Sequence, residues 1–429
     1  MFEHWKRVEE LDEVFIVRSA RGTYAYAPLQ HTSFAITLSC YESLQKGEAI
    51  AVRAVRERLD GKKPISIRDY SAVQSFEPHR VDLAITTRCN LACAYCHADS
   101  NSSIKEMDPN VAMAAVRFVI ENAARKRVPY AQVGFNGGGE PTVNFGMITK
   151  VIEYSRRLAS SLGTRVTFGM ATNAAFSSTI CDYVGENFSH IAVSLDGPPD
   201  IHDNQRPTVS GNGSCDIVFR NAKQLHLSEI RDFNIRATVS RSSVSRLEEI
   251  VRFFQAEFPR AGYSFMAINR LGRGADCAIE PPKSVEYIDA FVDILLVKKL
   301  CGLDKVFFMC GLLSTVRSTF CDAFSGPGFN VNVDGKLASC QRDNLPNEFY
   351  FGEIQTDGHI SIDYESINRF RQPRITTERE CIECFAKYNC GGECMDLVLH
   401  DQSRCDAIRH WTASQLDSLH LTYAQRLRS

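Results

Sequence analysis

The sequence predicts an α/β fold: a partial (β/α)6 barrel, with a small N-terminal α+β unit before it and a C-terminal cysteine-rich domain after it. From Val81 onward, six short β-type segments alternate with amphipathic helical segments, which is typical of consecutive βα units and a parallel sheet. Six units are fewer than the eight of a closed barrel, so we expect an open one. Beyond it, the chain is rich in cysteine and has little periodicity.

The barrel strands are predicted from runs rich in Val, Ile and Phe, which favour burial on both faces of the sheet. The predicted strands are 81–87, 131–136, 165–172, 190–197, 234–240 and 262–269. The predicted helices lie near 109–126, 145–162, 178–187, 216–227 and 245–258. Together they make residues 81–275 the barrel domain.

The flanking segments differ in pattern from the barrel. Residues 1–80 predict strands at 13–18, 23–28 and 33–38 and a helix near 47–60. A helical bridge at 276–309, with a helix near 284–300, leads to the cysteine-rich part at 310–405, and residues 406–429 predict a final helix. A segment as irregular as 310–405 needs a source of folding energy besides a hydrophobic core, and bound metal supplies one.

Composition narrows the function classes. The hydrophobic fraction is 44%, the charged fraction 23% and the formal net charge −2, which gives no electrostatic case for nucleic acid or a membrane as partner. The first residues contain no continuous apolar segment of the secretory kind, so we expect a cytoplasmic protein. Sixteen cysteines in a reducing compartment indicate metal or thiol chemistry rather than disulfides.

Three of the cysteines follow the first barrel strand in a C-x3-C-x2-C pattern: Cys89, Cys93 and Cys96. Three thiolates can hold an iron–sulfur cluster and leave one iron without a protein ligand, where a reaction can take place. A zinc site is the alternative, with His97 as fourth ligand, but His97 follows Cys96 directly and a shared tetrahedral site would be strained.

The other unusual motifs also follow strands. GGGEP comes after the second strand, TNAAF after the third, and SLDGPPDIHDNQRP after the fourth. In α/β barrels the chemistry lies at the C-terminal ends of the strands, so these motifs are expected to share one pocket with the cysteines. A glycine run beside a carboxylate suits a ligand that carries an amino group.

The cysteine spacing, with Tyr95 before the last cysteine, resembles the motif of the radical S-adenosylmethionine (SAM) superfamily. That resemblance implies a [4Fe–4S] cluster on Cys89, Cys93 and Cys96, whose open iron binds the amino and carboxylate groups of SAM. It also implies roles for seven further residues. Tyr95 would lie near the adenine, Gly138, Gly139 and Glu140 would bind the amino group, Asn173 and Ser194 the ribose, and Arg206 the carboxylate. Asp196 also resembles a family position, with a cap of a helix or turn as the alternative.

The C-terminal cysteines resemble the SPASM extension of radical enzymes that modify peptides and proteins, which makes 310–405 an iron–sulfur domain. The resemblance implies two auxiliary [4Fe–4S] clusters, three clusters in all, with zinc as the alternative metal. The first auxiliary cluster would take Cys321, Cys340 and Cys394, and the second Cys381, Cys384, Cys390 and Cys405. Cys310 either completes the first cluster or leaves it an open iron.

The same resemblance implies modification of a ribosomally made precursor peptide. Sulfatase-maturing relatives carry an aspartate base directly after the cysteine that corresponds to Cys340, and here Gln341 stands there, with Asp343 as a weak substitute. Cross-linking, as a cyclophane or thioether, is therefore favoured over side-chain oxidation, with epimerisation also open. A flavodoxin- or ferredoxin-type donor would supply electrons.

Two further alternatives stay open. Residues 1–80 resemble a winged-helix element that docks a leader peptide, or they form a packing cap on the barrel. From another functional class, the chain would be a non-catalytic iron–sulfur electron carrier. The Gly138–Glu140 and Arg206 motifs argue against a carrier, because a carrier needs no pocket for an amino acid.

Overall fold

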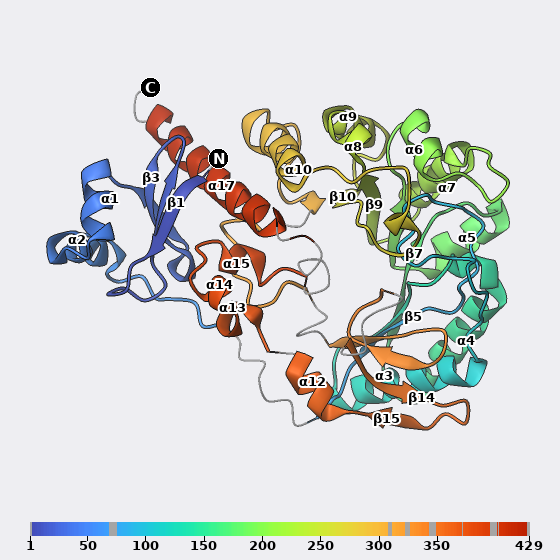
Figure 1. Cartoon of the computed structure of the whole chain (residues 1–429). Coiled ribbons are helices and arrows are strands. Elements are labelled where there is room, and N and C mark those ends of the chain that lie inside the picture. Colours follow the sequence, from blue (N-terminus) through green and yellow to red (C-terminus); the bar gives the residue numbers. More distant parts are fainter. Residues whose placement is uncertain are drawn as a thin grey trace.

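Two β-sheets organise the chain (Figure 1). The computed structural model describes residues 2–67, 75–307, 311–321, 327–342, 349–370, 372–394, 401 and 403–426. Within these parts, a four-stranded sheet is built from the N-terminal residues, and an 11-stranded sheet holds the remaining strands in the order β11-β10-β9-β8-β7-β6-β5-β12-β13-β14-β15. The mixed α/β fold with a central parallel sheet confirms the predicted fold class.

Six parallel strands form the barrel, and helices cover their outer face (Figure 1). The strands are β5 (Arg80–Leu83), β6 (Ala131–Phe135), β7 (Val166–Thr172), β8 (His190–Ser194), β9 (Asp232–Val239) and β10 (Gly262–Ala267). The helices between them are α3 (Pro109–Lys126), α4 (Phe145–Ser161), α5 (Ser178–Asn187), α6 (Pro199–Gln205), α7 (Cys215–Leu227), α8 (Arg241–Val244) and α9 (Leu247–Glu257). Short 3-10 turns are η1 (Pro28–Gln30), η2 (Pro141–Asn144) and η3 (Gly272–Ala275).

Three of the barrel helices begin at residues whose side-chain oxygens cap the helix N-terminus. The side chains of Asp108, Asn144 and Ser177 accept hydrogen bonds from backbone N–H groups in the first turns of α3, α4 and α5. Such caps satisfy donors that the helix leaves open at its N-terminus. The βα loops, which hold the predicted site, therefore end at fixed points.

The expected burial of both strand faces is wrong for part of the sheet. Buried and half-buried residues alternate along β8 and β9. In β9 the half-buried positions carry polar residues, namely Asn234, Arg236 and Thr238. Because the barrel is open and holds a polar cavity, its inner face does not need the apolar residues that fill a closed barrel.

The N-terminal unit contains one more strand and one more helix than the sequence predicts. Its strands are β1 (Phe2–Arg7), β2 (Phe15–Ser19), β3 (Thr23–Ala27) and β4 (Thr32–Ala35), and its helices are α1 (Leu38–Gln45) and α2 (Ala49–Leu59). The first strand has a charged, irregular sequence whose register shifts between Phe2 and His4. Residues 33–38 are predicted as one strand because they are mostly apolar. In the structure, α1 begins at the end of this run, where the Thr37 side chain caps the helix.

The C-terminal part is more regular than expected and joins the barrel sheet. Its strands are β11 (Val306–Phe307), β12 (Gly328–Val331), β13 (Lys336–Ala338), β14 (Tyr350–Ile354) and β15 (Ile360–Ile362). Strand β12 pairs in parallel with β5, where Phe329 lies opposite Val81. The β12–β13 turn contains Asp334-Gly335, and Gly335 has a φ of +85°, a hairpin signal that the sequence analysis passed over.

A long final helix connects the two sheets. The helices of this part are α10 (Ser284–Phe291) with a π-helical turn at Val292–Val297, then α12 (Tyr364–Phe370), α13 (Arg374–Thr377), α14 (Arg379–Ile382), α15 (Lys387–Cys390) and α17 (Ser403–Arg426). Helix α17 packs against α10 and against β1, β2 and β4 of the N-terminal sheet (Figure 1). None of the described helices is long and apolar enough to cross a bilayer.

Candidate radical-generating site

The three cysteines lie on one loop that leaves the C-terminal end of β5. The Asn101 side chain fixes the start of the loop, because its Oδ1 accepts from the Cys89 backbone N–H at 2.9 Å and its Nδ2 donates to the Cys89 carbonyl at 3.0 Å. The Cys89 sulfur accepts from the Leu91 N–H at 3.5 Å and the Asn173 amide at 3.7 Å. These donors would stabilise a thiolate.

The thiols are sheltered from solvent. Burial raises the pKa of the Cys89 thiol to about 12, and the nearby Glu140 carboxylate adds to the rise. Burial also raises the pKa of Cys93, against the effect of the Arg206 cation. Metal binds the thiolate form, so loading this site must release protons.

One cavity of about 180 Å³ brings the predicted residues together. All ten residues predicted for the first cluster and the SAM pocket line it: Cys89, Cys93, Tyr95, Cys96, Gly138, Gly139, Glu140, Asn173, Ser194 and Arg206. They come from the loops after β5, β6, β7 and β8 and from the end of α6. The expectation that the strand-end motifs share a pocket therefore agrees with the geometry.

The glycine run packs against the cysteine loop. Gly138 has a φ of +67°, and a Cβ there would lie 2.4 Å from the Thr86 carbonyl oxygen. A Cβ on Gly139 would lie 2.0 Å from the Arg88 carbonyl oxygen. The Gly139 N–H donates to Thr86 at 2.7 Å and the Glu140 N–H to Arg88 at 2.9 Å. Glycine is needed because two backbones meet here.

Glu140 already has several hydrogen-bond partners. Its Oε1 accepts from both the backbone and the hydroxyl of Thr142, at 3.2 and 2.7 Å, and from the Thr172 hydroxyl at 2.8 Å. Its Oε2 accepts from the Asn173 N–H at 2.7 Å. Burial raises the pKa of Glu140, and these bonds oppose the rise. Glu140 thus ties the second and third loops together, and Oε2 retains one site for a ligand.

Asp196, for which the sequence leaves open a family position or a cap, joins several of the remaining site residues. Its Oδ2 accepts from the Tyr95 hydroxyl at 2.6 Å, Gln205 at 2.8 Å and the Arg206 Nε at 3.2 Å. Its Oδ1 accepts from the Thr238 N–H at 2.9 Å. The Arg206 Nη1 lies 3.7 Å from the Cys93 sulfur. A lone aspartate after a strand gives no sequence signal for such a role.

Arg273 is a second residue that the sequence analysis missed. It lies in η3, after β10, and its side chain donates to the carbonyls of Cys93, at 3.1 Å, and of Ser100. Its backbone N–H donates to the Cys96 carbonyl at 2.9 Å. The last barrel loop therefore holds the cysteine loop closed. The only available signal was its position after the sixth strand.

His97, offered above as a zinc ligand, lines the same cavity. Burial, with the nearby Arg236 and Arg342 cations, lowers the pKa of His97 to about 4. In the described part of the chain, no three His, Cys, Asp or Glu side chains are close enough to hold a single metal ion. A [4Fe–4S] cluster takes each thiolate on a different iron, so its cysteine sulfurs lie apart.

Four C-terminal cysteines line another cavity, of about 710 Å³: Cys381, Cys384, Cys390 and Cys405. We call this the second cysteine cavity, and these are the residues expected to bind the second auxiliary cluster. Of the first auxiliary set, Cys321 is exposed, and Cys340 and Cys394 are half-buried. Cys310 and Asp343 lie outside the described residues. Gln341 lines the first cavity.

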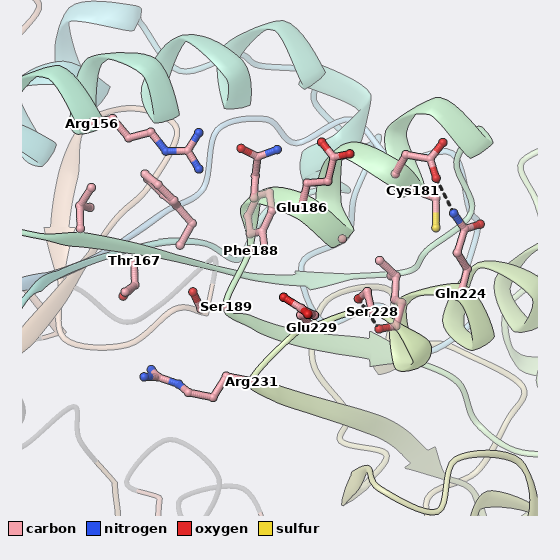
Figure 2. A pocket seen from close by; sticks show the side chains of 16 residues that line it. Arg156, Thr167, Cys181, Glu186, Phe188, Ser189, Gln224, Ser228, Glu229 and Arg231 are labelled. Atoms are coloured by element: carbon pink, nitrogen blue, oxygen red, sulfur yellow. Dashed lines mark hydrogen bonds between the residues drawn. The ribbon is translucent and has the colours of Figure 1, made fainter.

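A cavity of about 890 Å³ lies at the opposite end of the strands, between α5 and α7 (Figure 2). Its walls carry Arg156, Glu186, Glu229 and Arg231, and an Asp182–Gln224 hydrogen bond of 2.5 Å crosses one side. None of the predicted site residues lines it. This cavity is larger than the one at the cysteine loop, but it contains none of the predicted site residues, so we do not assign the reaction to it.

Comparisons with known proteins agree with the site geometry. Residues 83–254 match the family model described as the Radical SAM superfamily. The mycofactocin maturase of Mycolicibacterium smegmatis is 27% identical over 326 residues, which cover 72% of this chain and 76% of that protein. The matched family segment contains all ten residues that line the first cavity as predicted.

Two solved structures share the fold. The structure of anSMEcpe with bound AdoMet and Cp18Cys peptide has a TM-score of 0.58 and 18% identity, covering 81% of this chain and 97% of that one. Streptococcus suis SuiB bound to precursor peptide SuiA has a TM-score of 0.51 and 12% identity, covering 90% and 94%. The shared fold extends well beyond the barrel in both.

The residues present fit a [4Fe–4S] cluster and SAM, the cofactors of this superfamily. Three thiols from one short loop reach a shared cavity, and the glycine backbone and the Arg206 guanidinium border the same space. Polar groups for an amino group and a carboxylate therefore lie beside the sulfur ligands. Residues 83–254 match the Radical SAM superfamily, and the residues predicted for its cluster and SAM lie in one cavity, so this segment of the chain is a radical SAM domain.

Proposed function

We propose that this enzyme matures a ribosomally made precursor peptide by oxidative cross-linking, as a carbon–carbon cyclophane or a thioether. Cys89, Cys93 and Cys96 would hold the cluster, which together with SAM would supply a 5′-deoxyadenosyl radical to remove one hydrogen atom from the substrate. The substrate loses a second hydrogen, as a proton and an electron, when the new bond closes. The mature peptide is then two hydrogens lighter than its precursor.

The position of Gln341 carries this proposal. Gln341 belongs to the C-terminal extension, next to Cys340, and yet it lines the first cavity with the cysteine loop. A Cβ on Gly137 would lie 2.9 Å from the Gln341 carbonyl oxygen, so the extension packs directly on the glycine loop. An amide can orient a peptide by hydrogen bonds but cannot take up a proton as a carboxylate does.

That chemistry argues against oxidation of the sulfatase-maturing type. The aspartate base of those enzymes corresponds to Gln341 here, and Asp343 lies outside the described residues. In a cross-link, the electron released on bond closure would pass to an auxiliary cluster and the proton to solvent, so the step would not depend on a carboxylate at this position. Epimerisation stays the second alternative, since it exchanges one hydrogen and leaves the mass unchanged.

We propose three [4Fe–4S] clusters per chain. The second cysteine cavity supports one auxiliary cluster, because its four cysteines supply all the ligands that a cluster needs. Cys321, Cys340 and Cys394, with or without Cys310, would hold the other. An auxiliary cluster can accept the electron that leaves the substrate, so these sites fit an oxidative reaction.

The N-terminal unit is proposed to bind the leader of the precursor. Strand β4 is an outer strand of its sheet, and its Thr32 and Ser33 line a cavity of about 570 Å³. The other wall carries the apolar side chains Leu296, Leu303, Leu312, Leu313 and Leu419. An extended peptide can add to such an edge through main-chain hydrogen bonds while its side chains enter the apolar cavity.

We place the reaction in the cytoplasm, with a flavodoxin- or ferredoxin-type electron donor. Cluster assembly and low-potential electrons need a reducing compartment, and the many cysteines fit one. Dithionite replaces the donor in vitro.

The first test is SAM cleavage after anaerobic reconstitution. With dithionite and SAM, the enzyme should release 5′-deoxyadenosine, and the triple change Cys89→Ala, Cys93→Ala and Cys96→Ala should abolish that release and remove about a third of about twelve irons. The matched control changes Cys181, Cys215 and Cys301, which are buried outside both cysteine cavities, to Ala. Cleavage by the first variant, or none by the wild type with its iron intact, would refute the radical assignment.

The second test identifies the product. The short open reading frame beside the gene is co-expressed with the enzyme, and its peptide is analysed by mass spectrometry. A loss of two hydrogens with a ring that resists fragmentation supports the cross-link. The same loss in a peptide that reacts with a hydrazide probe indicates an aldehyde and contradicts it, and an unchanged mass indicates epimerisation.

A further inference from the structure

Arg409 of α17 lies against the second cysteine cavity. Its Nε donates to the Cys384 sulfur at 3.5 Å, and its side chain lines the cavity. The only described carboxylate that pairs with it is Asp406, at 2.8 Å. The Asp406 side chain is 62% exposed, whereas the Arg409 side chain is 15% exposed. Water therefore screens this ion pair, and the Arg409 guanidinium can still interact strongly with the Cys384 sulfur.

Trp5 of β1 holds Arg409 from the other side. The Arg409 Cζ lies 4.8 Å from the centroid of the Trp5 ring, in cation–π geometry. The indole N–H donates to the Glu383 carbonyl at 3.1 Å, and the ring packs on Phe385 with centroids 5.7 Å apart. Trp5 therefore contacts both neighbours of Cys384 as well as the arginine that reaches its sulfur.

We propose that Arg409 raises the reduction potential of the cluster in the second cysteine cavity, and that Trp5 fixes it in the position where it does so. This inference rests on the auxiliary cluster of the proposed function. Uptake of one electron makes the cluster more negative by one charge, and a cation with an N–H···S bond stabilises that state more than the oxidised one. Both residues are positioning residues, since neither binds iron or substrate.

The arrangement also gives the N-terminal unit an influence on the cluster. Strand β1 belongs to the sheet that we propose to bind the leader, and its Trp5 contacts the cluster loop directly. A shift of β1 would move the ring from Arg409 and so change the potential. Binding of the leader to the N-terminal unit would thereby change the reduction potential of the cluster.

The test is a redox titration of the reconstituted enzyme, followed by electron paramagnetic resonance. The signal of the first cluster is recognised because it changes when SAM is added. Arg409→Gln should lower one auxiliary potential, so that the ratio of reduced to oxidised cluster at a fixed potential falls about tenfold, or about 59 mV. Arg409→Lys keeps the charge and should shift it less.

The Trp5 variants test the support. Trp5→Leu should lower the same potential less than Arg409→Gln, and Trp5→Phe, which keeps an aromatic face, should leave it near the wild-type value. One control should leave it unchanged: Arg252→Gln, at an exposed arginine of α9 that pairs with Glu248.

Iron content separates the two levels of the proposal. If the wild type binds no iron at the second cysteine cavity, the auxiliary cluster itself is refuted. If the iron is present and Arg409→Gln leaves every potential unchanged, only the role of Arg409 is refuted. Should Arg409→Gln lose iron, Arg409→Lys and Trp5→Leu decide, and unchanged potentials in both would overturn the inference.

Discussion

Asp196 determines how the wall of the cavity is held, and His202 determines how Asp196 is held. The neutral His202 ring accepts at Nδ1 from the Asp196 backbone N–H, 3.3 Å away, and its Nε2 lies 3.0 Å from the Ser214 hydroxyl. Burial lowers the pKa of His202 from 6.5 to about 4. A protonated ring could no longer accept from Asp196, so the site depends on a neutral histidine.

This makes the stability of the fold sensitive to acid. Below pH 6.5 the unfolded chain binds a proton at His202 that the folded chain excludes down to about pH 4, so stability is lost as the pH falls through that window. At pH 5 the His202 contribution to this loss should be about 2 kcal/mol, and His202→Gln should remove that contribution while His97, whose pKa is lowered equally, keeps its own. Urea unfolding at pH 7.5 and pH 5 measures the difference.

The exposed His359 supplies the control. His359→Gln should keep the acid sensitivity of the wild type. If His202→Gln loses as much stability between the two pH values as the wild type does, the ring is not held neutral in the fold.

Among individual residues, the sequence predicts those that belong to one short motif. Cys89, Cys93 and Cys96 stand within one loop, and the glycine run is contiguous, so spacing alone identifies them. Asp196 and Arg273 could not be found in this way, because their partners come from loops far apart in the chain. Their roles depend on tertiary distances that no local pattern encodes.

At the scale of the elements, the loop between β6 and η2 lies directly against the start of the cysteine loop. Gly139 allows the contact, because the backbone of Thr87 and Arg88 occupies the space that any side chain would need. The close contact at Gly139 therefore determines how near the cysteine loop lies to the loop after β6. This is in addition to the role that we expect for the glycine loop beside SAM.

Gly139→Ala should displace the cysteine loop. The added Cβ would meet backbone atoms at 2.0 to 2.7 Å, and relief of such overpacking costs about 1–3 kcal/mol. We expect a lower iron content at the first cluster, at least tenfold slower release of 5′-deoxyadenosine and a reduced unfolding free energy. Iron analysis, product assay and urea unfolding give the three readouts.

Gly146→Ala is the matched change, since nothing lies within 4 Å of a Cβ at that position in the first turn of α4. Alanine favours the helix, so this variant should equal or exceed the wild type in stability. Equal behaviour of the two variants would contradict the close backbone contact at Gly139.

The elements themselves were predicted unevenly. The six barrel strands and the helices α3, α4, α5, α7 and α9 are predicted by their strong periodicity and regular spacing, whereas the short helices α6 and α8 are not predicted. Strands β12 to β15 are not predicted, because each is only three to five residues long and becomes a strand by pairing with the barrel sheet or its neighbours. Strand β1 was missed for a similar reason, since its charged residues mask the alternation.

For the whole molecule, helix α17 closes the chain onto its own beginning. Asp417 of α17 accepts from the Ser19 hydroxyl at 2.5 Å and the Tyr24 hydroxyl at 2.6 Å, both in the N-terminal sheet. The same helix carries Arg409 and starts near Cys405. The N-terminal sheet and the final helix therefore share buried hydrogen bonds.

Asp417→Ala should loosen this closure. It removes the acceptor of the Tyr24 hydroxyl and one of the two acceptors near the Ser19 hydroxyl, which also lies 3.2 Å from the Gly22 carbonyl, at a cost of about 1–3 kcal/mol. The melting temperature should fall by several degrees, and limited proteolysis should cut near the N-terminal unit first. Ser414→Ala, on the same helix, removes only a bond to the His410 carbonyl and should melt like the wild type. Equal melting of all three proteins would contradict the closure.

The pairing of β12 with β5 also affects how the protein is made. Strand β5 emerges from the ribosome early, but its partner β12 follows only after the entire barrel has been synthesised. Until then, the edge of β5 presents unpaired backbone groups to any strand that it meets. A chain released before Gly328 would keep that edge open and would be prone to aggregate, whatever the quality of its barrel.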